Sequence, residues 1–219
     1  METIARYSTT NDLLTVVIML VLLLLVLARQ MYPYRFEDFI SLFTSGKFLA
    51  IKSREHKTLF GFNVIMLFVH LLSLSIFIFV FYRTFIDQRI EEPWIVFLRI
   101  FTATSFLILL KITVEKIIAN VFDIDETIEG YLFQKHTYRN FISLGIFIIS
   151  IFLVYAHQIR EWIFYFAGAI FLGAIILSLA RVIAKNQRLV THNMFYFILY
   201  LCALEIAPYV ILYELVVRG

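Results

Sequence analysis

The chain has 219 residues, of which 62% are hydrophobic and 16% charged, whereas a soluble domain is about half apolar and a quarter charged. This composition excludes a soluble domain, and the long apolar runs lack the alternation of barrel strands, so we expect an all-α, polytopic transmembrane helical bundle. The net charge of +3 on so apolar a chain argues against nucleic acid as a partner.

Six apolar runs approach the roughly 20 helical residues that cross a bilayer core about 30 Å thick. The run 94–114 differs from the others in containing Arg99 and Lys111. We assign all six to a single integral membrane domain over residues 1–219. The predicted spans are 13–28, 59–82, 94–114, 141–155, 162–180 and 194–217.

The distribution of Lys and Arg predicts the orientation of these spans. Most basic residues fall between spans one and two, three and four, and five and six, and basic short loops stay in the cytoplasm. Both termini are therefore predicted to lie outside. A cleaved signal peptide is the alternative for the first run, because Val26, Leu27 and Ala28 resemble a cleavage site. The basic residues that closely follow this run favour a retained span.

The loop after the first span contains a short amphipathic segment at 35–43. Phe36, Phe39, Ile40 and Phe43 share one helical face, and Pro33 and Gly46 flank the segment. This pattern predicts a short helix on the cytoplasmic side. The helix either lies in the membrane interface or packs on the inner end of the bundle.

An acidic cluster follows the third span, and its members are Asp123, Asp125, Glu126 and Glu129. Such carboxylates bind Mg²⁺ and a diphosphate in some membrane transferases. The cluster is single and irregular, so the simpler interpretation is a solvated helix extension with local ion pairs. No other catalytic motif is present in the sequence, and we expect no metal and no cofactor.

Two ionisable residues are predicted at one depth near the middle of the membrane. His70 and Glu205 each lie eleven residues into a span that runs outward, which places both about 16 Å deep. They can share a proton, either as a structural hydrogen bond or as one step of a proton path. Pro208 leaves the carbonyl of Leu204 without its usual donor, so a kink is expected beside Glu205.

A second ion pair is predicted nearer the outer surface. Arg99 enters the membrane from the outer side and lies about 7 Å deep, whereas Glu214 lies about 4 Å deep from the same side. The two depths match, so we expect these side chains to pair.

The last span has a specific pattern, and the motif is carried by Leu199, Tyr200, Leu201, Cys202, Leu204, Glu205, Pro208 and Tyr213. With residues 138–141, this LYLCxLEIxP-type segment resembles an uncharacterised family of bacterial multi-span inner-membrane proteins, known only as a domain of unknown function. The resemblance implies the inner membrane of Gram-negative bacteria and implies no activity.

Three functions remain open from the sequence. The first is a non-enzymatic integral membrane subunit or assembly factor of a larger envelope complex for secretion or transport, which requires a membrane-protein partner as well as the lipid bilayer. The second is a small proton-coupled transporter or channel that uses Glu205 and His70. The third is a metal-dependent lipid-modifying enzyme that uses the acidic cluster. The absence of catalytic motifs favours the first.

Overall fold

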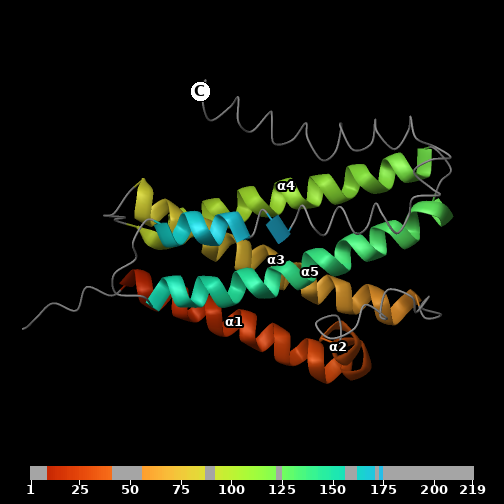
Figure 1. The fold of residues 1–219 in the computed structure, drawn as a ribbon, viewed down its shortest axis with the longest axis horizontal. Coiled ribbons are helices and arrows are strands. Elements are labelled where there is room, and N and C mark those ends of the chain that lie inside the picture. The colour runs from red at the N-terminus through yellow and green to blue at the C-terminus, as the bar shows by residue number, and fades with distance from the viewer. Residues whose placement is uncertain are drawn as a thin grey trace, which may run out of the picture. The chain divides into compact units, whose positions relative to one another are not determined.

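The computed structural model describes residues 9–40, 56–86, 92–121, 125–155, 162–170 and 173–174. Within these ranges the chain is helical and contains no strand (Figure 1). A further helical segment covers 162–170. The labelled helices are α1 (Thr9–Met31), α2 (Pro33–Ile40), α3 (His56–Phe85), α4 (Pro93–Val121) and α5 (Asp125–Tyr155).

Four of the described helices are long and apolar enough to cross a membrane, which confirms the helical membrane fold. They overlap the first four predicted spans. The fifth predicted span, 162–180, is described only in part, and the sixth, 194–217, lies outside the described residues. The four candidate spans are Asp12–Met31, Gly61–Phe85, Pro93–Ile117 and His136–Tyr155.

The chain divides into two compact units. The first contains Met1–Ser105 and His136–Ile175, and the second contains Phe106–Lys135 and Ile176–Gly219. Helices α1, α2 and α3 therefore belong to the first unit, as do the start of α4 and most of α5. The assignment of one domain to the whole chain stays a prediction.

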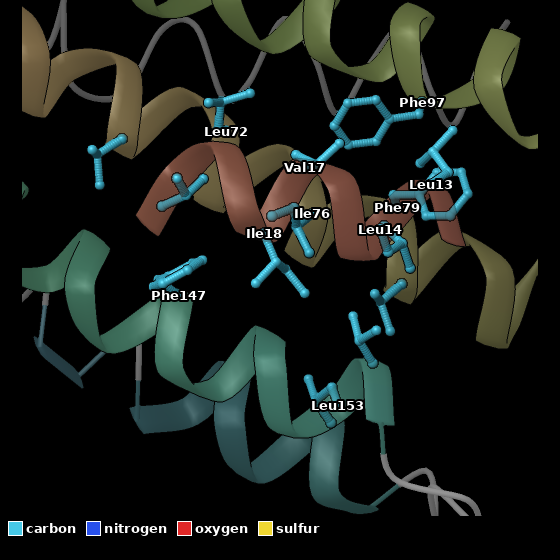
Figure 2. Close-up of a cluster of buried hydrophobic side chains, with 14 of the residues drawn as sticks. Leu13, Leu14, Val17, Ile18, Leu72, Ile76, Phe79, Phe97, Phe147 and Leu153 are labelled. Atoms are coloured by element: carbon cyan, nitrogen blue, oxygen red, sulfur yellow. The ribbon is translucent and has the colours of Figure 1, made fainter. Parts of the chain in front are cut away.

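Helix α3 is the centre of the first unit. Its residues from Val69 to Ser73 are buried in succession, so the helix is covered on every side. The side chains of α1 that pack here are spaced three and four residues apart, which places them on one face. Figure 2 shows this α1 face against α3 and α5. The packed residues include Leu14, Val17, Ile18 and Val21 of α1, Val69, Leu72, Ile76 and Phe79 of α3, and Phe147 and Leu153 of α5.

The opposite face of α1 is also apolar, and it is exposed. Val16, Leu20 and Leu23 lie there. Lipid tails are as apolar as leucine, so burial against another helix brings no hydrophobic gain inside a bilayer. Close packing and hydrogen bonds therefore hold these helices together, and the outer face of α1 suits contact with lipid.

Hydrogen bonds between side chains connect two pairs of helices in the first unit. The hydroxyl oxygens of Ser75 in α3 and Thr104 in α4 lie 3.0 Å apart. The hydroxyl oxygens of Thr15 in α1 and Tyr155 in α5 lie 2.9 Å apart. Such bonds in a membrane contribute about 0.6 kcal/mol on average, so they fix the helix register more than they raise stability.

The amphipathic segment forms the predicted short helix, α2, which packs on the bundle through Phe39. This side chain is 1% exposed and contacts Ala28, Phe62 and Met66. Its ring centroid lies 5.9 Å from that of Phe62 in an edge-on arrangement. Ile40, predicted on the same face, is 46% exposed, because α2 is oriented with Phe39, and not Ile40, toward α3. Phe43 lies outside the described residues.

Gly61 of α3 lies against the side chain of Tyr32, at the junction between α1 and α2. A Cβ atom at this position would collide with the Oη of Tyr32 and lie 2.9 Å from its Cζ. We predict that Gly61→Ala lowers the free energy of unfolding by about 1–3 kcal/mol through overpacking. Thermal unfolding in detergent measures this change.

Two companion variants give the Gly61 prediction its controls. Tyr32→Phe removes the Oη and should recover part of the loss when combined with Gly61→Ala. Nothing lies within 4 Å of a Cβ at Gly145, so Gly145→Ala should be neutral or stabilise the helix by up to about 1 kcal/mol. Equal losses for Gly61→Ala and Gly145→Ala would show that the contact with Tyr32 is unimportant.

Candidate functional site

His70 is a buried polar side chain in the membrane-crossing part of α3. It lies nine residues beyond Gly61, where the candidate span begins, which is about 14 Å along the helix. The side chain is 7% exposed, and its Nδ1 makes no hydrogen bond with the residues that the structure describes. An unpaired polar atom in this setting costs free energy, so His70 is a candidate functional residue.

Helix α5 carries a buried polar face at the start of its candidate span. Thr137, Asn140 and Ser143 are three residues apart and are all buried, so they follow one side of the helix. The hydroxyl of Ser143 donates a hydrogen bond of 2.5 Å to the backbone carbonyl of Asn140. The Oδ1 of Asn140 makes no hydrogen bond within the described part of the chain. The same helix becomes apolar further along, at Phe147 and Leu153.

Phe141, next to the polar face of α5, packs on the same phenyl ring as Phe62 of α3. The ring centroid of Phe39 lies 5.9 Å from that of Phe62 in α3 and 6.3 Å from that of Phe141 in α5. Helices α3 and α5 run in the same direction (Figure 1). The positive charge of Arg139, one residue before Asn140, acts on His70. His70 lies eight residues beyond Phe62, or about 12 Å.

This arrangement supports hydrogen bonding more directly than metal binding. A neutral imidazole offers one nitrogen as donor and one as acceptor, and the nearby charge of Arg139 disfavours a second cation. Within the described ranges, no group of three His, Cys, Asp or Glu side chains is placed to hold a metal ion.

The structure describes only the first member of each of the two predicted intramembrane pairs. His70 is buried as described above, and Arg99 is exposed on α4. Glu205, Pro208 and Glu214 lie outside the described residues. The pairs His70 with Glu205 and Arg99 with Glu214 therefore stay predictions.

The acidic cluster falls at the beginning of α5. Asp125, Glu126 and Glu129 lie in its helical backbone, which agrees with a helix extension, although their side chains are not described. Asp123 lies outside the described residues. Metal binding and local ion pairs at this cluster both stay predictions.

The family model for a domain of unknown function (DUF4271) matches residues 14–216. The chain belongs to this family. The matched range extends from the first predicted span into the last, so the DUF4271 domain includes the helices that carry His70 and Asn140. This membership agrees with the expected resemblance to a family of unknown function. Neither the curated proteins nor the solved structures contain a match to this DUF4271 chain.

The sequence analysis did not identify Asn140 or Arg139 as intramembrane residues. The predicted span began at 141, whereas the candidate span begins at His136, so both residues were assigned to a loop. The spacing of 137, 140 and 143 is the signal that identifies this face, once the span is extended by a helical turn.

Glu115 is a second residue that the sequence analysis did not identify. It is 2% exposed in α4, within the candidate span Pro93–Ile117, and it has an interaction partner, as does Lys111 one turn earlier. The predicted span ended one residue before Glu115. The sequence signal for Glu115 is a carboxylate one helical turn from a lysine, just beyond the end of a predicted span.

Proposed function

We propose that the protein is a non-enzymatic integral membrane subunit or assembly factor of a larger bacterial envelope complex, of the secretion or transport kind. The observation that carries this proposal is the outward surface of α4. In an 18-residue window of the candidate span Pro93–Ile117, 6% of residues are buried, against 56% in the window of Gly61–Phe85. Trp94, Ile95 and Leu98 at the start of α4 are all exposed. They form an apolar face to which another membrane helix can bind.

Arg99 makes this face more suitable for a protein partner than for lipid alone. It is exposed and lies six residues beyond Pro93, or about 9 Å along the helix. An arginine facing hydrocarbon costs up to about 2.5–3.5 kcal/mol at the bilayer centre and less toward the surface. A carboxylate relieves this cost, and it comes either from a partner or from Glu214 of the same chain.

We further propose the bacterial inner membrane as the location, with six spans and both termini outside. The basic loops support this orientation, and the apolar helices suit a lipid bilayer. In this orientation α2 lies on the cytoplasmic side. The burial of Phe39 holds it against the bundle, and the exposed Tyr34 and Ile40 are free to contact the interface.

A small proton-coupled transporter or channel is the second candidate function. It is favoured by the buried polar side chain of His70 in a helix long and apolar enough to cross the membrane. In this alternative, Glu205 exchanges the proton with His70. The transporter needs no partner, so the two candidates differ in what is recovered from native membranes.

The proposed function predicts that Leu98→Trp weakens association with the partner. Leu98 is 52% exposed and Ile148 of α5 is 67% exposed, so Ile148→Trp is a matched control that adds the same side chain to another apolar face. We expect the wild type and Ile148→Trp to co-purify from native membranes with a stoichiometric membrane protein. Leu98→Trp should recover several-fold less of it at equal abundance.

Purification of the wild type without a partner, together with proton flux in reconstituted vesicles, would favour the transporter. Equal recovery of the partner by the wild type, Leu98→Trp and Ile148→Trp would show that the exposed face of α4 does not bind the partner.

A further inference from the structure

Among the buried polar atoms of the first unit that make no hydrogen bond within the described residues, two belong to α3 and to the polar face of α5. They are the Nδ1 of His70 and the Oδ1 of Asn140. His70 is more than nine-tenths buried and Asn140 almost completely buried. Hydrocarbon offers neither atom a partner, so the partner is either a residue outside the described ranges, such as Glu205 for His70, or a small ligand between the helices.

The chemistry of the two atoms defines the class of this ligand. The Oδ1 of Asn140 only accepts hydrogen bonds, and the Nδ1 of a neutral His70 accepts one when Nε2 carries the proton. Both therefore suit a neutral donor. The positive charge of Arg139 acts on His70 and disfavours a cation. Water is the small neutral donor that most often fills such positions in proteins.

The polar face of α5 provides a route from the membrane boundary to this site. Thr137 lies one residue beyond His136, where the candidate span begins, and Asn140 and Ser143 follow on the same face. Asn140 adjoins Phe141, which packs on Phe39 together with Phe62, and Phe62 lies about 12 Å before His70 along α3. Beyond this region, α5 buries Phe147 and Leu153, with the polar Ser150 between them.

We propose that water enters between α3 and α5 at the His136 end and occupies a polar site that extends from Asn140 to His70. The site does not depend on a partner protein, so its test is independent of the proposed subunit function.

Cysteine accessibility in native membrane vesicles tests the site. A thiol reacts with a water-soluble reagent only where water reaches the thiol and allows it to ionise to the thiolate. The single native Cys202 is first replaced by Ser. Asn140→Cys, Ser143→Cys and His70→Cys are then treated with a negatively charged, membrane-impermeant methanethiosulfonate. Ile146→Cys is the matched control, since Ile146 is buried on the same helix and is apolar.

We expect Asn140→Cys and Ser143→Cys to react at least tenfold faster than Ile146→Cys, and His70→Cys to react faster than the control but more slowly than Asn140→Cys. Ser143→Cys changes one atom, so it decides the outcome if a larger change prevents folding. Rates at 140 and 143 equal to that at 146 would overturn the hydrated site. A rate at 70 equal to the control would overturn its extension to His70.

Discussion

Phe39→Asp should destabilise the protein more than any other substitution in α2. The phenyl ring is almost completely buried between Ala28, Phe62 and Met66, and replacing a buried Phe with a small residue costs about 3–5 kcal/mol. A carboxylate in the same place has no described partner, which adds a desolvation cost. We therefore expect a loss of at least about 3 kcal/mol, measured as a large drop in the thermal unfolding midpoint in detergent.

The adjacent Ile40 provides the control for this experiment. It is 46% exposed, and surface substitutions usually change stability by less than about 0.5 kcal/mol. Ile40→Asp should therefore unfold close to the wild-type temperature. A similar drop for both variants would show that α2 is held by its whole apolar face in the membrane interface. No drop for Phe39→Asp would show that α2 does not pack on the bundle.

Glu205→Leu should strongly reduce the amount of folded protein if Glu205 is the partner of His70. The buried Nδ1 of His70 lacks a hydrogen bond within the described residues, and removing the partner of a buried polar group costs about 1–3 kcal/mol. Glu205→Gln keeps a polar side chain and should preserve abundance. Size-exclusion profiles of the detergent-solubilised variants measure this difference.

The functional result for Glu205→Gln separates the two roles of the pair. A structural hydrogen bond tolerates glutamine, so function should be retained. A proton path requires a titratable group, so function should be lost while the folded protein stays abundant. Normal abundance and function for Glu205→Leu would contradict the pairing in both roles.

The helices could be predicted from the sequence because the bilayer thickness sets the length of an apolar run. Their inward and outward faces could not. In α1, Val17 is buried and Val16 is exposed, although both are valine, because the lipid-facing and protein-facing sides of a membrane helix are equally apolar. The burial of Phe39 compared with Ile40 depends in the same way on where α3 lies.

The candidate site could be predicted only where a polar residue interrupts an apolar run. His70 satisfies this condition, since its neighbours Val69 and Leu71 are apolar. Asn140 does not, because it lies among the polar residues 134–140 that precede the apolar run 141–155. The electrostatic effect of Arg139 on His70 depends on how α3 and α5 pack, and no local sequence pattern records that packing.

Photo-crosslinking in living cells tests the partner of α4 most directly. A photoreactive amino acid is placed at Leu98, and in a separate protein at Ile148, which is exposed on α5. The proposed function predicts one discrete crosslinked membrane protein from position 98 and none from position 148. Crosslinks to lipid alone from both positions would contradict the claim that the protein is a subunit bound through α4.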